Sequence, residues 1–455
     1  MIASDKITYL DNNATTAIDP AVLEAMWPFL EKYFANPSSG YRFAAQVRDA
    51  IEQAREQVAA LLGCEPGEIV FTSCGTESNN TAFHSALETR PECKHVVTTA
   101  VEHSAVRKPA QELERHGYEV TVIGVDKSGR LSLRAVADAI RPDTALVSVM
   151  WANNETGVIF PIEEIAEIAR DKNVPLHTDA VQAAGKISIN LREIQLQFLS
   201  ISGHKLHAPK GVGALYVNRR SRFHPLLLGG SHENNRRAGT ENAASIVALG
   251  KAAEVALLKL PEEQTRVRNL RDRFEKALIE KIPNARVNGA GAPRLVNTSS
   301  MTLLSELRYT DPDGVVWIAP EGSVVDGASI PRVLWSLMGG PFDGKYRNAS
   351  VLHDVSYDQQ MRPWKQCDRM FYDAMRCSGV GETEAKTMYY ALYRHGRHWK
   401  RTHFLPGSAT AEDEIVPRAI AVDEQEDVAA TRDWIENARP SLAQIEARAA
   451  AAPSH

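Results

Sequence analysis

The stretch FLSISGHKLHAPKGVGALYV, residues 198–217, is the most informative part of the sequence. Two apolar runs in it, FLSIS at 198–202 and GALYV at 213–217, have the length and the side-chain types of buried strands. Lys205 lies a few residues after the first run. In an open α/β sheet, ligands bind in the crevice beyond the carboxyl ends of the strands. The stretch therefore predicts two strands of such a sheet and a ligand site beside Lys205.

Five further runs of the same kind lie upstream and alternate with helical patterns, in which apolar residues recur three and four apart. They are EIVFTS (68–73), KHVVTTA (94–100), EVTVIGV (119–125), ALVSVMWA (145–152) and PLHTDA (175–180). This alternation predicts an α/β fold with βαβ units and a mostly parallel, seven-stranded sheet covered on both faces. Two helices are expected after the sheet, over 242–258 and 262–281.

Composition narrows the class of protein. The chain has 455 residues, 44% hydrophobic and 24% charged, with a net charge of −5 and no strongly basic run, which predicts a globular protein that does not bind nucleic acid. No apolar run approaches the ~20 residues of a membrane helix, so we expect no membrane segment. The five scattered cysteines indicate reduced thiols and a cytoplasmic location. Their spacing predicts no metal site.

Chemistry-bearing residues follow the predicted strands. CGTESNN, residues 74–80, opens a helix after the first strand, and small or hydroxyl-bearing residues at a helix N-terminus suit a phosphate. Because parallel strands end at the same edge, residues after the other strands are expected to converge on Lys205. These residues are His103, Asn154, Asp179 and Gln182. A lysine, a carboxylate, a histidine and a phosphate loop together indicate a pyridoxal 5′-phosphate site.

The chemistry of that cofactor assigns a role to each residue. Lys205 is expected to hold the cofactor covalently, and Asp179 to keep the pyridine nitrogen protonated so that the ring withdraws electrons. His103 is expected to lie over the ring and, with Lys205, to be catalytic. Hydrogen bonds to the phenolic oxygen are assigned to Asn154 and Gln182. The phosphate is assigned to Gly75, Thr76, Ser202 and His204.

Eight motifs, in order, resemble those of the cysteine desulfurases of the nitrogen-fixation type, which are fold-type-I pyridoxal-phosphate enzymes of the class-V aminotransferase family. Over about residues 7–303 they read YLDNNATT, ANPSSG, FTSCGTESNN, TAVEHSAV, NNETG, HTDAVQ, SGHKLHAPKGVG and RRAGTEN. Each motif alone has an ordinary structural explanation, such as a helix cap. Eight motifs in family order are much more specific, and the roles deduced above agree with those of the family.

The resemblance implies sulfur removal from L-cysteine, or a similar amino acid, for iron–sulfur cluster assembly. It also implies a scaffold protein that accepts the sulfur, and a homodimer in which Thr240 of RRAGTEN contacts the phosphate of the neighbouring subunit. The resemblance ends with PRLVNTSSMTLL, residues 293–304. In the family, a nucleophilic cysteine on a Ser/Gly-rich loop and a later arginine lie beyond this point, and neither follows here. Sulfur transfer is therefore expected to be weak or absent.

The change of character near residue 297 predicts four parts. Residues 1–260 are expected to form the large cofactor domain, and 261–306 a remnant of the family's small C-terminal domain. Residues 307–405 are expected to form a small, mainly helical α+β domain rich in aromatic residues, and 406–455 an acidic, Ala-rich tail. The alternative to a desulfurase is a catalytically impaired fusion protein, in which the C-terminal domain has a binding or hydrolase-like role.

Residues 309–400 resemble an uncharacterised domain family of phage and bacterial genomes, through DGASIPR (326–332), NASVLHDVSYD (348–358), CDRMFYDAM (367–375) and MYYALYRHGRHW (388–399). The spacing places His353, Asp354 and Tyr357 on one helix, and Asp368 and Asp373 on the next. A helix-borne histidine that faces an aspartate can activate water, as in secreted phospholipases A2, which also carry an HDxxY helix. The interpretation that we favour from the sequence is a buried polar network that orients the two helices.

Overall fold

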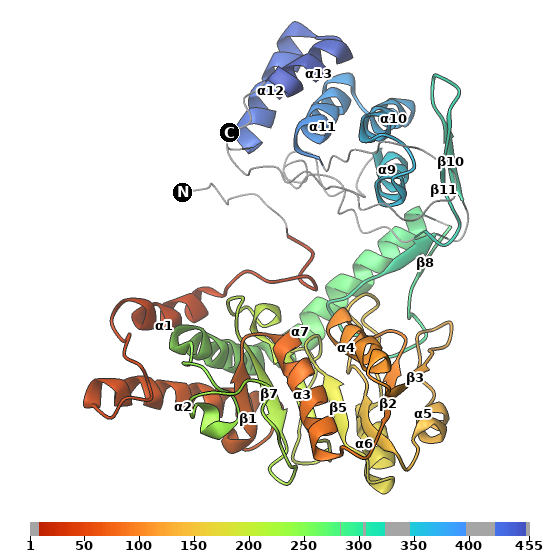
Figure 1. Cartoon of the computed structure of the whole chain (residues 1–455). Coiled ribbons are helices and arrows are strands. Elements are labelled where there is room, and N and C mark those ends of the chain that lie inside the picture. Colours follow the sequence, from red (N-terminus) through yellow and green to blue (C-terminus); the bar gives the residue numbers. More distant parts are fainter. Residues whose placement is uncertain (1–8, 283, 304–305, 324–345, 397–423, 452–455) are drawn as a thin grey trace. The chain divides into compact units, whose positions relative to one another are not determined.

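The computed structural model describes residues 9–282, 284–303, 306–323, 346–396 and 424–451. These residues divide into two compact units (Figure 1). The first, here called the sheet unit, comprises Asp11–Ala277 and Val287–Ser300. The second, here called the C-terminal unit, comprises the described residues of Met1–Leu10, of Leu278–Arg286 and of Met301–His455. The domain boundaries expected at 260, 306 and 405 stay predictions, because compact units and evolutionary domains need not coincide.

The sheet unit contains a seven-stranded sheet of order β1-β7-β6-β5-β4-β2-β3, in which the expected runs form all seven strands. Only β7 is antiparallel to its neighbours, β1 and β6, so the prediction of a mostly parallel sheet is confirmed. The strands are β1 Ile69–Thr72, β2 His95–Thr99, β3 Glu119–Ile123, β4 Thr144–Ser148, β5 Leu176–Asp179, β6 Phe198–Ser202 and β7 Gly213–Val217. Apart from the edge strand β3, every strand is buried along its whole length, which explains the continuous apolar runs.

Helices cover both faces of the sheet, because successive strand residues point to opposite sides. Val70 and Val96 pack in a cluster with α3 and α4, whereas Ile69 and Val97 pack in a larger cluster with α2, α6 and α7. The helices of the unit are α1 Pro20–Glu31, α2 Arg42–Leu62, α3 Gly75–Thr89, α4 Ser104–Arg115, α5 Leu133–Ala139, α6 Ile162–Asp171 and α7 Ala243–Lys281. Three short 3₁₀ turns are η1 Pro66–Glu68, η2 Gly203–Lys205 and η3 Glu233–Asn235.

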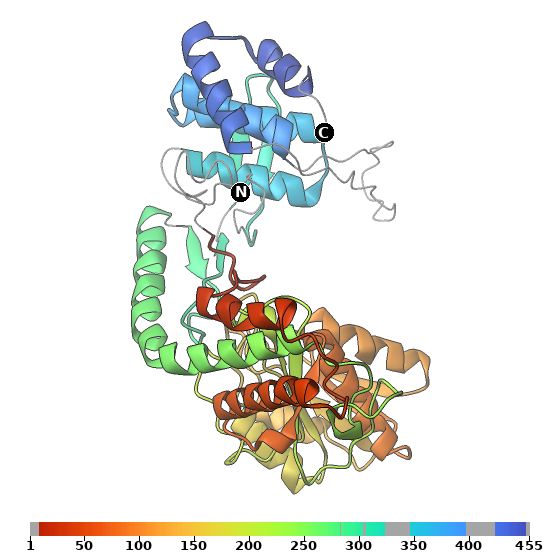
Figure 2. The ribbon, with the colours of Figure 1, turned by 90° about the vertical axis from the view of Figure 1, so that its left-hand side faces the viewer.

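The expectation of two separate helices over 242–258 and 262–281 is wrong. A single helix, α7, runs from Ala243 to Lys281 with Pro261 inside it. Figure 2 shows a sharp bend within this helix. A proline removes one intrahelical hydrogen bond and clashes with the preceding turn, so it can bend a helix without ending it.

The C-terminal unit is mainly helical, as expected. A β-hairpin, β10 Leu307–Thr310 and β11 Val316–Ala319, precedes α9 Arg347–Gln359, α10 Trp364–Cys377 and α11 Glu382–His395. Two further strands, β8 Ala285–Val287 and β9 Met301–Leu303, pair with each other. The described part of the expected tail forms α12 Glu424–Ala438 and α13 Leu442–Ala451, and these helices contribute Val428 and Ile445 to the core of the unit. The motif DGASIPR (326–332) lies outside the described residues. No helix in the described ranges is long and apolar enough to cross a bilayer.

Candidate active site

The predicted cofactor residues lie in the loops at one edge of the sheet. Lys205 ends η2 directly after β6, Asp179 is the last residue of β5, and His103 caps α4 just after β2. Gly75 begins α3 after β1, and Asn154 lies in the loop after β4. The strands β1, β2, β4, β5 and β6 all run in the same direction, so these loops share one edge.

Lys205 has the surroundings of a reactive amine. Its Nζ donates hydrogen bonds to the backbone oxygens of Asn13 and of Ala14, the latter at 2.9 Å. Burial lowers the pKa of this amine, although the nearby carboxylates of Asp11 and Asp179 act in the opposite direction. A lowered pKa increases the fraction of neutral amine, which is the form that attacks a carbonyl carbon.

Asp179 is a buried carboxyl group with a defined orientation. Its Oδ2 accepts a hydrogen bond from Asn79 Nδ2 at 2.7 Å, and its Oδ1 accepts one from the backbone N–H of Val181 at 3.0 Å. Burial raises the pKa of this carboxyl group. The two hydrogen bonds and the charges of His103 and Lys205 act in the opposite direction but are weaker, so the pKa stays above its ordinary value. A cation placed against the carboxyl group would favour its ionised form, which is the condition for pairing with a protonated ring nitrogen.

The remaining ring candidates, His103, Gln182 and Asn154, differ in the hydrogen bonds that they make. Nδ1 of His103 accepts the N–H of Ala105 at 3.1 Å, so the other ring nitrogen carries the proton when the ring is neutral. Gln182 donates from Nε2 to the oxygen of Asn13 at 2.9 Å, and its buried Oε1 has no partner in the described structure. The side chain of Asn154 donates to Glu155 at 2.6 Å and is thus occupied locally.

The start of α3 fits a phosphate group. The backbone N–H groups of Gly75, Thr76 and Glu77 donate no hydrogen bond within the described part of the chain. Such free N–H groups and the helix dipole both favour an anion. Helix and sheet approach closely here, because a Cβ atom on Gly75 would lie 2.8 Å from Val181 Cγ2 and 3.3 Å from Ser202 Cβ. Only a glycine allows this approach without a shift of the helix or of the neighbouring Val181 side chain.

The two other phosphate candidates and Thr240 differ in burial. Ser202 is buried at the end of β6, and His204 contacts Thr15 Oγ1 through Nδ1 at 3.2 Å. Burial and the charges of Lys205 and Lys210 lower the pKa of His204. Thr240 is exposed on the surface of the sheet unit.

Together, these residues fit the three parts of pyridoxal phosphate. The amine of Lys205 matches its reactive aldehyde, the buried carboxyl group of Asp179 matches its ring nitrogen, and the unpaired N–H groups at the start of α3 match its phosphate.

Asn13 connects the parts of the site, and the sequence analysis assigned it no role. Its backbone oxygen accepts from Lys205 and Gln182, and its Nδ2 donates to the oxygen of Asn154 at 3.2 Å and to Thr298 Oγ1 at 3.0 Å. Its Oδ1 accepts from Asn297 Nδ2 at 3.1 Å. The only signal in the sequence was its place in the motif YLDNNATT, since asparagine in a loop is otherwise ordinary.

Two ion pairs beside the start of α3 were also missed. Glu77, in the first turn, accepts hydrogen bonds from Arg237 Nε at 3.0 Å and from Nη2 at 3.3 Å. Burial would raise the pKa of Glu77, but the hydrogen bonds from Arg237 and from Ser73 outweigh it, and the pKa is lowered. The second pair joins Glu233 to Arg55 at 2.8 Å, with side chains 2% and 4% exposed.

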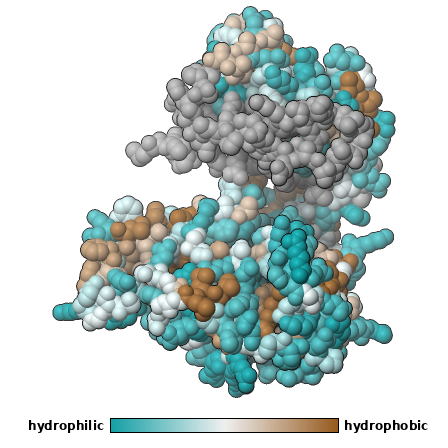
Figure 3. Space-filling view, in the orientation of Figure 1, coloured by the Kyte–Doolittle hydropathy of each residue, from teal (hydrophilic) through white to brown (hydrophobic). Residues whose placement is uncertain are grey.

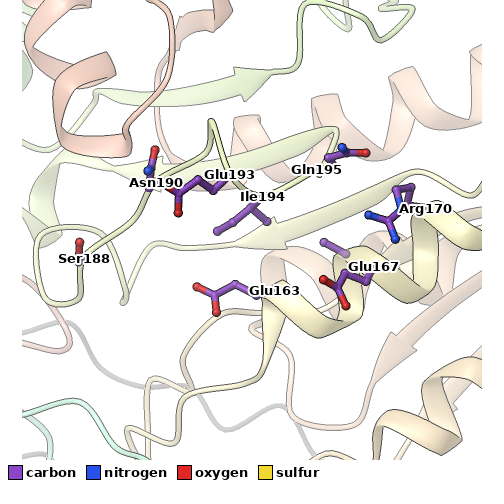
Figure 4. Close-up of a pocket in the computed structure, with 9 residues that line it drawn as sticks. Glu163, Glu167, Arg170, Ser188, Asn190, Glu193, Ile194 and Gln195 are labelled. Carbon is purple, nitrogen blue, oxygen red and sulfur yellow. The ribbon is translucent and has the colours of Figure 1, made fainter.

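One cavity in the described part of the chain does not belong to this site. It measures about 500 Å³ and is lined by α6 and the segment 188–195 (Figure 4). None of the residues that line it belongs to the cofactor site. Its polar side chains include Glu163, Glu167, Glu193 and Arg170. Within the described ranges, no group of three or more His, Cys, Asp or Glu side chains could hold a metal ion.

Residues 8–307 match the family described as aminotransferase class-V. The chain belongs to the class-V aminotransferase family. Residues 301–392 match a second family, described as a protein of unknown function (DUF1353). The resemblances expected for both parts of the chain are thus confirmed.

The part of the chain that matches the class-V family, residues 8–307, is similar in sequence to cysteine desulfurases. It is 52% identical over 295 residues to cysteine desulfurase 2 of Trichormus variabilis, covering 65% of this chain and 74% of that protein. It is 53% identical over 294 residues to the cysteine desulfurase NifS of Azotobacter vinelandii, covering 64% and 73%. Among solved structures, a NifS-like protein superposes with a TM-score of 0.66 at 31% identity, covering 82% of this chain and 100% of the other. The structure titled SspA in complex with cysteine gives 0.59 at 37% identity, covering 65% and 84%.

The C-terminal unit brings together three of its five predicted polar residues. His353 Nε2 lies 3.1 Å from Asp368 Oδ1, and the hydroxyl of Tyr357 donates to the same oxygen. Asp354 is buried on the same helix as His353. Asp373 lies on α10 with Asp368, as expected, and pairs there with Arg369 at 2.8 Å.

Proposed function

We propose that the sheet unit binds pyridoxal 5′-phosphate on Lys205 and acts on L-cysteine or a similar amino acid. One observation carries this proposal: Lys205, whose amine has a lowered pKa, and the buried carboxyl group of Asp179 both lie at the same edge of the sheet. When bound, the cofactor supplies an electron sink for the α-carbon of an amino acid. The similarity to cysteine desulfurases supports cysteine as the substrate.

The residues of the chain would divide the work as follows. Asp179 keeps a proton on the pyridine nitrogen, and Asn79 fixes the orientation of its carboxyl group. His103 lies over the ring, with its tautomer fixed by the N–H of Ala105. Lys205, once released, can hold or move the proton of the substrate α-carbon. Gly75 and Thr76 offer their backbone N–H groups to the phosphate.

We further propose that sulfur transfer is weak or absent. A desulfurase requires a thiolate positioned next to the substrate sulfur, and burial raises the thiol pKa of both Cys64 and Cys367 to about 12. Burial also raises the pKa of Cys93. Without a positioned thiolate, the reaction loses an advantage that reaches ~7–11 kcal/mol in favourable cases. The family match also ends at residue 307, and a different family covers the residues that follow.

A homodimer is part of the same proposal. One face of α1 exposes Leu23, Trp27, Leu30 and the following Phe34, whose side chains are 46%, 57%, 55% and 77% exposed. Their spacing of four, three and four residues forms a continuous apolar stripe, which a monomer rarely leaves uncovered. Figure 3 shows apolar residues over this region of the sheet unit. A second subunit would cover the stripe and would bring its own Thr240 to the phosphate site.

The five unpaired cysteines agree with a reducing, cytoplasmic location.

Borohydride reduction tests the cofactor assignment. The purified protein should be yellow, and reduction followed by peptide mapping should locate the cofactor on Lys205. Lys205→Ala should remove the label, whereas Lys210→Ala, which changes a nearby lysine, should keep it. A protein that stays colourless after addition of cofactor, or that carries the label on Lys210, would contradict the assignment. Sulfide release from L-cysteine, measured on the same samples, separates cofactor binding from sulfur transfer.

A further inference from the structure

His353 differs in one respect from His95 and His177, which are fully buried histidines among the described residues. The ring nitrogens of His95 and His177 all have hydroxyl partners at 2.8–3.0 Å, from Thr144 and Thr121 for His95 and from Ser148 and Ser200 for His177. His353 is equally buried, but only its Nε2 has a partner. Its Nδ1 and the Oδ2 atom of Asp368 have none in the described structure. Full burial therefore does not distinguish His353 from a structural histidine, whereas the unpaired nitrogen does.

An unpaired buried nitrogen is costly, so its presence requires an explanation. Leaving a buried polar atom without a partner costs about 1–3 kcal/mol. A network that served only to join α9 and α10 would gain stability if a hydroxyl faced Nδ1, as it does in His177. The unsatisfied atom instead suggests that Nδ1 is kept available for a group that is not part of the fold.

The bonds around Asp368 fix the proton of the imidazole. Both the hydroxyl of Tyr357 and Nε2 of His353 contact the same carboxylate oxygen, which can only accept. In the neutral ring, Nε2 therefore carries the proton and Nδ1 presents its lone pair. An imidazole that is oriented by a carboxylate on one side and has a free lone pair on the other is the arrangement of a general base.

We propose that His353 is a general base that activates water, and that the C-terminal unit hydrolyses carboxylic esters with an apolar acyl group. Because Nδ1 has no serine or cysteine partner among the described residues, water is the nucleophile. The rings of Tyr357 and Phe371 flank the imidazole, with centroids 4.0 and 5.0 Å from it, and the group lies inside the hydrophobic core of the unit. These surroundings match an apolar acyl chain better than a charged substrate.

The proposed reaction balances without any further reactant. The oxygen of water forms a bond with the ester carbonyl carbon while Nδ1 takes one proton from the water. The bond between that carbon and the alcohol oxygen then breaks, and the imidazolium returns the proton to the leaving alkoxide. The products are a carboxylic acid and an alcohol, and His353 is regenerated. Asp368 and Tyr357 act as positioning residues throughout.

Ester hydrolysis by the full chain tests the proposal. The substrates are chromogenic esters of short and of long acyl chains, and each is assayed with and without added divalent cations. We expect hydrolysis that favours the long chains, and a kcat lowered on the order of 10²–10⁴-fold by His353→Asn. His395→Asn is the matched control, because His395 also pairs with an aspartate, Asp427 at 3.1 Å, and should leave the activity unchanged. Absence of hydrolysis by the unmodified chain, or an unchanged rate in His353→Asn, would overturn the proposal.

A second variant keeps the test decisive if His353→Asn fails to fold. Tyr357→Phe removes one of the two donors to Asp368 and should lower kcat about tenfold with KM unchanged. A purely structural hydroxyl would instead lower the melting temperature and leave kcat as it was. The assay does not involve the cofactor, so its outcome is independent of the function proposed for the sheet unit.

Discussion

Glu102 offers a sharp test of the electrostatics beneath the cofactor site. This side chain is 6% exposed, and its Oε1 accepts hydrogen bonds from Thr99 Oγ1 at 2.7 Å and from the N–H of Met150 at 2.9 Å. Its Oε2 has no partner in the described structure. Burial is the main cause that raises the pKa of Glu102 from 4.5 to about 8, and the charge of Asp179 acts in the same direction. The carboxyl group is therefore neutral at neutral pH.

The sign and size of the effect on stability follow from this pKa. Between 4.5 and about 8 the folded protein holds a proton on Glu102 that the unfolded chain releases. Stability should therefore fall as the pH rises through this window, and it should be fully retained below it. The interval from 4.5 to about 8, at about 1.4 kcal/mol per pH unit, corresponds to at most about 5 kcal/mol.

Glu102→Gln should remove this pH dependence while keeping the shape of the side chain. We expect the two proteins, compared in the same cofactor state by urea unfolding, to differ by about 1 kcal/mol or less near pH 5. The variant should be the more stable one by several kcal/mol near pH 8.5. Subtracting the two curves cancels other titrating groups, such as His177, whose pKa burial lowers to about 3. A difference that stays constant over this range would refute the reasoning.

Three further predictions concern the cofactor site and its support. Asp179→Asn should slow exchange of the substrate α-proton with D₂O about 10²-fold or more, and an unchanged exchange rate in NMR would remove Asp179 from its role. Arg237→Gln should weaken cofactor affinity about tenfold, because the carboxylate of Glu77 then remains unneutralised beside the phosphate, and adding Glu77→Gln should restore the affinity. A double variant that binds as weakly as Arg237→Gln would show a purely structural pair. Glu233→Ala should cost about 1–3 kcal/mol of unfolding free energy, because Arg55, which keeps Glu52 as a partner, and the backbone N–H of Phe71 both lose the buried carboxylate, and no measurable cost would show that water replaces it.

The strands and the order of the site loops could be predicted from the sequence because both depend on local patterns. Continuous β-branched runs identify strands that are covered on both faces, and the polar residues after them must then share one edge. The position of Lys205 after β6 and of Asp179 at the end of β5 follows from this rule alone. The break expected at Pro261 was wrong because the proline bends the helix and does not end it.

The residues that the sequence analysis missed are those with distant partners. Asn79 was read only as part of a helix start, yet it orients Asp179, which lies 100 positions later. Asp373 was included in the expected polar network, but Arg369, one turn away on the same helix, is its hydrogen-bond partner. The unpaired nitrogen of His353 has no sequence signal, because a missing partner is visible only when all the neighbours are known.

The hydrogen bonds of Asn13 have a consequence for how the protein is made. They join the first loop of the chain to Asn154, Gln182 and Lys205, and finally to Thr298, which is 285 positions away. A growing chain emerges from the ribosome at about 5–20 residues per second, so the last of these bonds has to wait roughly 15–60 seconds after the first loop appears. In the proposed function, the cofactor can therefore be held in its final geometry only after the whole sheet unit has been synthesised. A chain that stops before residue 298 is expected to keep its sheet residues but to hold the cofactor loosely.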